Sequence, residues 1–202
     1  MFITFEGIDG SGKSTQIKRL KKRLEDRQEE VRVFRDPGGP LVSEKVREIL
    51  LNPEYDIDPV TELLLFSAAR SQLMAESVLP SLEKDMVVIL DRFYDSTIAY
   101  QGYGRESATL SEIHKMNKVA SHHREPDLTV YMRVPLEEAK KRMAAEKDRM
   151  ELSGDTFYEK VIQGFEDLAD SEDRIFTVDA TQPADQVHDR IWQQVRDRFY
   201  QS

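Results

Sequence analysis

The chain has 202 residues, a formal net charge of −9 and no cysteine. An acidic chain of this length is expected to form one domain over residues 1–202 and to repel nucleic acid, while the lack of cysteine excludes disulfides and thiolate metal sites. Met1 stands one residue before an apolar strand pattern and no apolar run reaches membrane-spanning length, so we expect a cytoplasmic protein with no membrane partner.

Apolar periodicity predicts that strands and helices alternate along the chain. After Lys13, the apolar residues Ile17, Leu20 and Leu24 recur at helical spacing, and Asp58 is placed as the N-cap of a long helix. This alternation indicates an α/β fold with a doubly wound, five-stranded parallel sheet flanked by helices. The predicted strands are FITFEG (2–7), VRVF (31–34), MVVIL (86–90), LTVYMRV (128–134) and RIFTVDA (174–180), and the other helices begin near residues 109 and 135 or cover 187–199.

The segment GIDGSGKS follows the first predicted strand and matches the pattern G-x-x-x-x-G-K-[ST] at every position. Its glycines allow backbone N–H groups to turn toward a phosphate, Lys13 reaches the terminal phosphates, and the Ser14 hydroxyl can ligate Mg²⁺. The segment therefore predicts a P-loop NTPase-type fold with a magnesium–nucleoside triphosphate site. The predicted phosphate-binding residues are Gly7, Ile8, Asp9, Gly10, Ser11, Gly12, Lys13, Ser14 and Thr15.

Asp91 directly follows the buried run MVVIL, at the end of a parallel strand where ligands bind. An acid there can orient the water shell of Mg²⁺. A GTPase would also need an Asn-Lys-x-Asp motif, and the only similar segment, NKVA at 117–120, lacks the acid. The sequence therefore favours a kinase over a GTPase switch.

Two arginines end neighbouring predicted strands and could hold phosphate. Arg35 begins the segment RDPGG, and Arg92 follows Asp91. Each guanidinium can bind a phosphate through two hydrogen bonds. The alternative is that they pair with nearby acids, Arg35 with Asp36 and Arg92 with Asp91 or Asp95.

Arg70 lies on the long apolar helix and has no acid three or four residues away. Phe66 precedes it by one turn on the same face, so an aromatic plane and a hydrogen-bonding fork are available for a flat heterocyclic base. The alternative is that Phe66 packs in the core while Arg70 extends into solvent.

Five segments together resemble the thymidylate kinase family of nucleoside monophosphate kinases. Their order and approximate spacing are those of the family, and they span essentially the whole chain. The segments are FEGIDGSGKST (5–15), RDPGG (35–39), LLLFSAAR (63–70), DRFYDSTIAYQG (91–102) and DRMELSGDTFYEKVIQGFEDLA (148–169).

This resemblance implies transfer of the γ-phosphoryl group of ATP to thymidine monophosphate (dTMP) with Mg²⁺, and it gives roles to named residues. Phe66 would stack on thymine and Arg70 would bind the base edge, with Tyr100 excluding a 2′-hydroxyl. Asp9 would lie near the 3′-hydroxyl and the waters of the metal. The implied acceptor site is Asp9, Arg35, Phe66, Arg70, Arg92, Ser96, Thr97, Tyr100 and Gln101, and the implied catalytic residues are Lys13, Arg92, Arg149 and Asp9.

The segment KKRMAAEKDRME resembles the mobile lid of family members that supply catalytic charge from the lid, which would span about 140–155. Other members carry an arginine in the phosphate loop, where this chain has Gly10 and Ser11. The resemblance therefore assigns the charge to Arg149, with Arg142 and Lys147 behind it. The alternative is a solvated helix face held by ordinary surface ion pairs.

Two other functions stay open on the sequence: a kinase for a different monophosphate, and an ATP-binding regulatory module with little phosphoryl transfer. The family also implies a homodimer formed through the helices from residues 59 and 109. Asp36 stands where the family usually has Glu, and we expect this difference to adjust the kinetics without abolishing activity.

Overall fold

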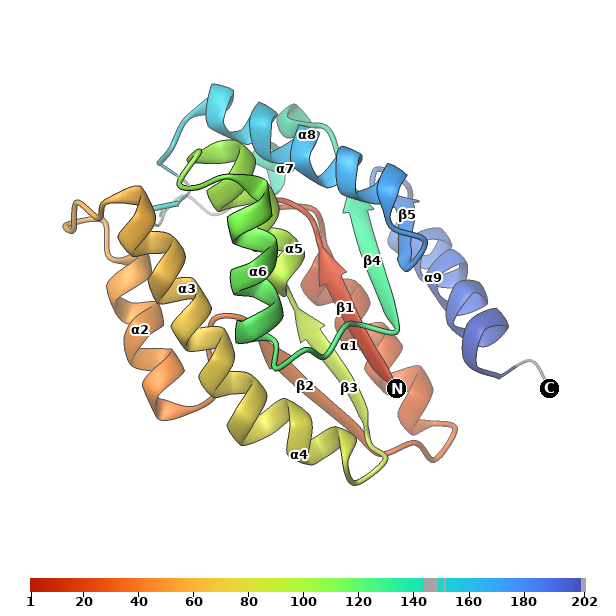
Figure 1. Cartoon of the computed structure of the whole chain (residues 1–202). Helices are drawn as coiled ribbons and strands as arrows, with labels where there is room; N and C mark the ends of the chain where they lie inside the picture. The colour runs from red at the N-terminus through yellow and green to blue at the C-terminus, as the bar shows by residue number, and fades with distance from the viewer. Residues whose placement is uncertain (144–148, 151, 201–202) are drawn as a thin grey trace.

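The computed structural model describes residues 1–143, 149–150 and 152–200. In that part of the chain the strands form one parallel five-stranded sheet in the order β2-β3-β1-β4-β5 (Figure 1). The predicted α/β fold with a parallel sheet is confirmed. The strands are β1 Phe2–Glu6, β2 Val31–Arg35, β3 Val87–Asp91, β4 Leu128–Arg133 and β5 Ile175–Asp179.

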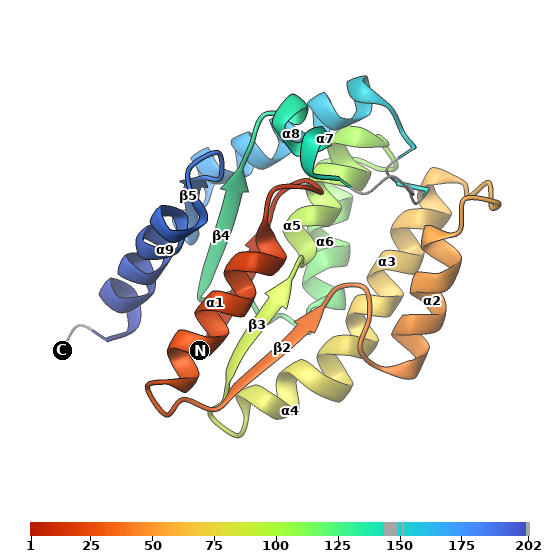
Figure 2. The same ribbon diagram turned by 180° about the vertical axis from the view of Figure 1, so that it is seen from behind.

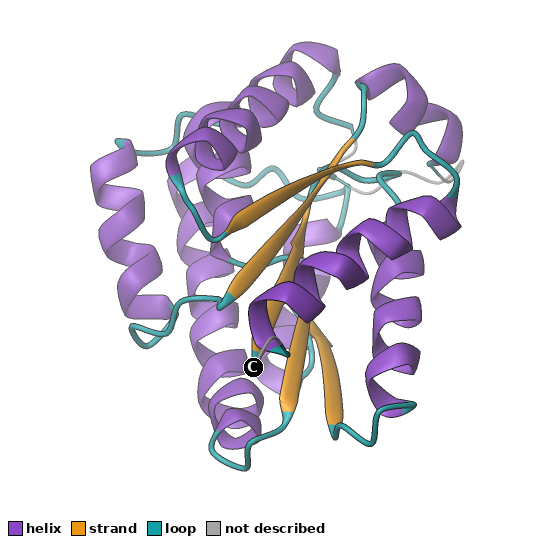
Figure 3. Cartoon of the chain, turned by 90° about the vertical axis from the view of Figure 1, so that its right-hand side faces the viewer, coloured by secondary structure: helices purple, strands orange, loops and turns teal. Residues whose placement is uncertain are grey.

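Helices cover both faces of the sheet. Helices α1 and α9 lie on one face, as the view from behind shows (Figure 2), while α3, α4, α5, α6 and α8 lie on the other (Figure 1). Figure 3 shows helices on both sides of the strands. Helix α2 packs along the outer side of α3 (Figure 1). The helices are α1 Lys13–Glu25, α2 Leu41–Leu51, α3 Pro59–Leu73, α4 Leu79–Leu82, α5 Tyr94–Thr97, α6 Leu110–Ala120, α7 Leu136–Arg142, α8 Asp155–Ser171 and α9 Ala184–Phe199, with π-helical turns η1 Met74–Val78 and η2 Ile98–Gly104.

Two helices begin at side-chain caps that the sequence signals. Asp58 caps α3 by accepting from the backbone of Val60 and Thr61, and Thr109 forms a capping box with Glu112 at the start of α6. None of the helices described here is long and apolar enough to cross a membrane.

The side chains of strand β1 alternate between the two faces of the sheet, one of which is covered by α3 and α5. This alternation places Ile3 and Phe5 in one core cluster and Phe2 in another. Thr4 and Glu6 share the side of Phe2 and are buried polar residues, with the Thr4 hydroxyl 2.8 Å from that of Thr129. A buried acid therefore lies at the carboxyl end of the central strand.

The structure adds helical features that the periodicity did not predict. The segment after β3 forms α5 and continues without a break into η2, where the Arg105 N–H donates to the Tyr100 carbonyl five residues earlier. π-Helical turns are rare and occur frequently at functional sites. In this chain the turn carries Tyr100 and Gln101, two of the predicted acceptor residues.

Candidate active site

The phosphate loop connects β1 to α1 at the carboxyl end of the sheet. Gly12 precedes α1 with a φ of 91°, a conformation that glycine adopts without strain. The Lys13 ammonium folds back over the loop and donates to the carbonyls of Gly7 (2.9 Å) and Ile8 (3.1 Å). Burial and the nearby Arg92 charge lower the pKa of Lys13 to about 8.

Gly10 explains why this loop carries no arginine at that position. Its φ is 77°, and a Cβ atom there would approach the Ala139 carbonyl oxygen to 2.3 Å. Any side chain would collide with the backbone of α7. Position 10 therefore cannot supply the catalytic charge that an arginine in the loop provides in other family members.

A cavity of about 430 Å³ lies above the loop, and we call it the phosphate basin. The Ser14 hydroxyl donates to the Asp91 carboxylate at 3.5 Å across its floor, so the two residues predicted to support Mg²⁺ are brought together. Such oxygen donors suit Mg²⁺, which usually keeps several waters and binds through few protein groups. The basin is lined by Asp9, Gly10, Gly12, Lys13, Ser14, Thr15, Arg35, Asp36, Arg47, Asp91, Arg92 and Arg142.

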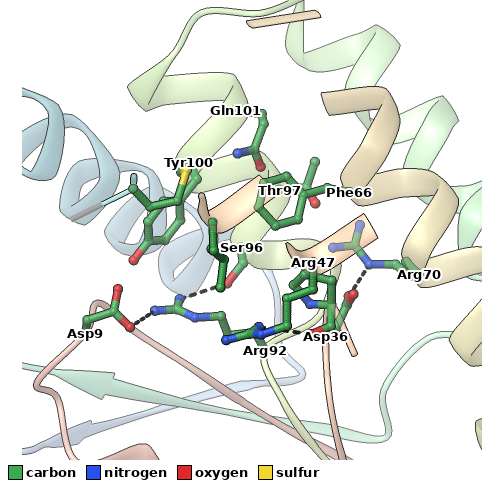
Figure 4. Close-up of a pocket in the computed structure, with 13 residues that line it drawn as sticks. Asp9, Asp36, Arg47, Phe66, Arg70, Arg92, Ser96, Thr97, Tyr100 and Gln101 are labelled. Atoms are coloured by element: carbon green, nitrogen blue, oxygen red, sulfur yellow. Dashed lines mark hydrogen bonds and ion pairs between the residues drawn. The ribbon is translucent and has the colours of Figure 1, made fainter. Parts of the chain in front are cut away.

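A second cavity, of about 90 Å³, adjoins the basin, and we call it the acceptor pocket (Figure 4). Eight of the nine predicted acceptor residues line it, the exception being Arg35. Four residues border both cavities, so the two are continuous. The pocket is lined by Asp9, Asp36, Pro37, Arg47, Leu51, Phe66, Arg70, Arg92, Ser96, Thr97, Tyr100, Gln101 and Met150, and the shared residues are Asp9, Asp36, Arg47 and Arg92.

Helical geometry explains how one short segment supplies four side chains to the acceptor pocket. Ser96 and Thr97 precede Tyr100 and Gln101 by four residues, so all four lie on one side of α5 and η2 (Figure 4). A strand or an irregular loop of the same sequence would not present them together.

Arg92 spans the boundary between the two cavities. Its φ is 68°, an uncommon conformation for a residue with a side chain. The guanidinium donates to Asp9 Oδ1 (2.7 Å), to the Gly7 carbonyl (2.9 Å) and to Ser96 Oγ (3.2 Å), and it lies 5.0 Å from the centre of the Tyr100 ring. Although burial raises the pKa of Asp9, the charges of Arg92 and Lys13 outweigh it and lower that pKa to about 2.

Glu6 supports this arrangement from below. Its carboxylate is 1% exposed and accepts from the Phe93 N–H (2.7 Å) and the Ser96 hydroxyl (2.6 Å). Burial, together with the charge of Asp95, raises the pKa of Glu6 to about 8.

Arg70 is buried at the opposite end of the acceptor pocket, 1% exposed, so the expected alternative of a solvated arginine is wrong. It donates to Asp36 Oδ2 (2.5 Å), Asn117 Oδ1 (3.2 Å) and the Phe93 carbonyl (3.3 Å). Burial raises the pKa of Asp36, and Arg70 opposes that shift. A guanidinium has five N–H donors, so two of those of Arg70 have no acceptor among the described residues and could serve a ligand.

Three residues that line the acceptor pocket carry a buried polar atom with no hydrogen-bond partner among the described residues. The atoms are Thr97 Oγ1, Asp36 Oδ1 and the hydroxyl oxygen of Tyr100. Because buried polar groups in native proteins are nearly always paired, these atoms indicate that a polar ligand completes the pocket.

Two predicted residues lie elsewhere than the resemblance implied. Arg35 lines the phosphate basin instead of the acceptor pocket, and its partner is Glu44 at 3.0 Å, not the adjacent Asp36. Arg149 lines neither cavity and pairs with Glu62 at 2.5 Å. The predicted lid over 140–155 is only partly described, and Lys147 lies outside the described residues.

Arg142 is the predicted lid residue that lines the phosphate basin. It donates to the Ala180 carbonyl at 2.9 Å.

Sequence reasoning missed several residues of this site. Arg47, on α2, borders both cavities and donates to the Pro37 carbonyl at 3.0 Å, and Met150 and Leu51 close the acceptor pocket. Arg47 and Leu51 belong to no local motif, and Met150 lies within the segment DRMELSGDTFYEKVIQGFEDLA without an expected role of its own. Glu6 carried a signal, because an acid ending an otherwise apolar strand needs partners.

A phosphate loop at the carboxyl end of a parallel sheet, opening onto a pocket that holds arginines and unpaired polar atoms, defines a P-loop kinase that acts on a small acceptor. The family model for thymidylate kinase matches residues 5–191. The chain belongs to the thymidylate kinase family, which confirms the resemblance.

Individual relatives agree with this assignment. The thymidylate kinase of Prosthecochloris aestuarii is 46% identical over 210 residues, covering 98% of this chain and 94% of the relative. That of Kosmotoga olearia is 42% identical over 194 residues, covering 95% of this chain and 93% of the relative. The crystal structure of thymidylate kinase from Ehrlichia chaffeensis superposes with a TM-score of 0.78 at 35% identity, covering 96% of this chain and 98% of that one.

Proposed function

We propose that this chain transfers the γ-phosphoryl group of ATP to dTMP, giving ADP and thymidine diphosphate. The observation that carries the proposal is the continuity of the phosphate basin with the acceptor pocket, which share Asp9 and Arg92. Membership of the thymidylate kinase family supports the choice of substrates. Phosphoryl transfer needs two bound nucleotides in line, and two joined cavities with cations at the junction meet that need.

On the donor side, the loop N–H groups and Lys13 would hold the ATP phosphates, as in other phosphate loops. Ser14 would ligate Mg²⁺, with Asp91 acting through water. When bound, Mg²⁺ neutralises charge on the phosphate oxygens. Arg142 would add positive charge at the basin, whereas Arg149 is bound by Glu62 away from the basin in this structure.

On the acceptor side, Phe66 would stack on thymine while Arg70 and Thr97 bind the polar base edge. Arg70 and Thr97 both have hydrogen-bonding groups that no described residue uses. Tyr100 would lie against the sugar. Arg92 would exchange its Asp9 partner for the 5′-phosphate, with Arg35 and Arg47 reaching it from the basin side. Ser96 and Gln101 complete the pocket wall.

We further propose a cytoplasmic homodimer in which residues 1–202 act as one kinase domain. Helices α3 and α6 expose the apolar side chains of Val60 (47%), Leu64 (54%) and Val119 (69%), which offer apolar surface to a partner. A second copy would cover it. Light scattering would show twice the chain mass, and Val119→Asp would give a monomer; a monomeric parent protein would remove the proposal.

A coupled ADP-release assay tests the activity, with magnesium–ATP and a panel of ribo- and deoxyribonucleoside monophosphates, on the parent chain and on Phe66→Ala. We expect strong preference for dTMP that is lost in the variant. Turnover with another monophosphate would keep the kinase and overturn the base assignment. Binding of ATP without turnover on any acceptor would favour a regulatory module.

A further inference from the structure

Glu62 is a completely buried carboxylate that lies outside both cavities. It is in the first turn of α3 and is 0% exposed. Its oxygens accept from Gln101 Nε2 (2.8 Å), Arg149 Nη2 (2.5 Å) and, at 3.4 Å, Arg105 Nε. Three segments that are distant in the sequence therefore meet on one acid.

Two of these partners connect Glu62 to the wall of the acceptor pocket. Gln101 lines the pocket itself. Arg149 immediately precedes Met150, which also lines it, and the Arg149 N–H donates to the carbonyl of the lining residue Leu51 at 3.2 Å. The side of the pocket formed by Leu51, Gln101 and Met150 is thus held together through Arg149 and Glu62.

Arg105 connects Glu62 to a second group of residues, Ser153 and Phe157. Its guanidinium donates to Ser153 Oγ at 2.8 Å and lies 4.5 Å from the centre of the Phe157 ring. Arg105 therefore links Glu62 to the chain that leads into α8. Glu62 therefore binds Arg149 directly and Ser153 through Arg105.

Burying this carboxylate is costly, and an ion pair of this kind often contributes little net stability compared with apolar packing. The hydrogen bonds of such an ion pair do, however, fix the positions of several groups at once. We infer that Glu62 is a positioning residue for the acceptor nucleotide: by holding Gln101 and Arg149 it sets the wall of the acceptor pocket.

This inference rests on the proposed function of that pocket. It also gives Arg149 a role different from that of a cation on the transferring phosphoryl group.

The kinetic constants for the two substrates separate positioning from general stability. Because Glu62 contacts the wall of the acceptor pocket and does not line the phosphate basin, its removal should weaken dTMP binding selectively. A loss of global stability alone would reduce the active fraction and would leave both KM values unchanged.

The test uses the full chain and compares Glu62→Gln, Arg149→Met and the double variant, with KM for dTMP, KM for ATP and kcat measured well below each Tm. The control is Glu166→Gln, since Glu166 also binds an arginine, Arg133, through two oxygens and lines neither cavity. We expect KM for dTMP to rise about tenfold in both single variants, with KM for ATP changing less than about twofold. The KM for dTMP of the double variant should not exceed the higher of the two values for the single variants, and the KM of the control should match that of the parent.

Several outcomes would overturn the inference. An unchanged KM for dTMP in Glu62→Gln would remove it, as would an equal rise for both substrates. If kcat falls in Arg149→Met while KM for dTMP stays constant, Arg149 acts on the phosphoryl group and not on the pocket wall. Should Glu62→Gln fail to fold, Arg149→Met decides alone. A parent chain that does not turn over dTMP would instead refute the proposed function.

Discussion

The acceptor pocket contains two arginine–aspartate pairs that differ in burial. The side chains of Arg70 and Asp36 are 2% and 0% exposed, whereas those of Arg92 and Asp9 are 18% and 36% exposed. Arg70 is held by three acceptors from separate elements on a regular helix. Arg92 instead occupies a strained backbone conformation between the two cavities. The buried pair suits a fixed recognition group, and the open pair suits a group that exchanges its partner during a reaction.

The strain at Arg92 is informative because residues in sparsely populated conformations cost on the order of 1 to 3 kcal/mol and gather at functional sites. In this chain the conformation directs the guanidinium across the phosphate loop to Asp9 and Gly7. Arg70 needs no unusual backbone conformation, because its position on α3 already directs its side chain into the acceptor pocket.

The largest effect we expect is on stability, and it distinguishes the two pairs. Asp36→Asn leaves the Arg70 charge buried without a counter-charge, so the free energy of unfolding should fall by about 3 to 5 kcal/mol. Asp9→Asn removes the counter-charge of a partly exposed arginine and should cost less than about 1 kcal/mol. Urea denaturation monitored by circular dichroism measures both.

Equal losses in Asp36→Asn and Asp9→Asn would show that the two pairs are energetically alike, and the proposed division of roles would then lack support.

The second prediction concerns catalysis at the open pair. Arg92→Met should lower kcat/KM by about 10²- to 10³-fold, because a cation at the cavity junction stabilises charge that develops in the transition state. Its Tm should change little, since Asp9 can be solvated once Arg92 is absent. Steady-state assays with saturating ATP and varied dTMP, beside a melting curve, provide the measurement. A parent-like kcat/KM would exclude Arg92 from the reaction.

Local patterns in the sequence predicted the sheet and the phosphate loop, whereas most of the residues predicted for the acceptor pocket came from the resemblance to the family. Asp91 after MVVIL and Lys13 after the glycines are positioned by the elements that contain them. Arg47 and Glu62 were missed because their roles come from packing between α2, α3 and distant segments, which no local spacing encodes. Arg149 was assigned to phosphate by resemblance, although Glu62, 87 residues away, holds it in this structure.

The third prediction concerns Glu6, the buried acid near Arg92, and the dependence of stability on pH. The pKa of Glu6 is raised from 4.5 to about 8, so the folded chain binds a proton that the unfolded chain releases between these values. Stability therefore falls as pH rises from about 5 to 7.5, by on the order of 2 to 3 kcal/mol from this group. Glu6→Gln cannot titrate, so its stability curve should be flatter over that range. Parallel curves for parent and variant would contradict a buried, protonated Glu6.

The fourth prediction uses the unpaired hydroxyl near the buried pair. Thr97→Val removes a buried oxygen that has no partner among the described residues, so the ligand-free protein should keep or slightly raise its Tm. If Thr97 binds the base as proposed, the same change removes that hydrogen bond, and KM for dTMP should rise about tenfold. Calorimetry of the free protein and steady-state kinetics measure the two effects. A lower Tm with an unchanged KM would mean that the hydroxyl serves the fold and not the ligand.

The smallest effect is expected for Asp36→Glu, which keeps the charge and adds one methylene beside Arg70. The Asp36 side chain is buried but borders both cavities, so the longer carboxylate has space on the pocket side and can still meet the guanidinium. We expect turnover within about tenfold of the parent, because cores tolerate a one-methylene change when neighbours can shift. Saturation kinetics with both substrates measure it. A rate below about one hundredth of the parent would show that the shorter acid sets the position of Arg70 and that the buried pair tolerates no displacement.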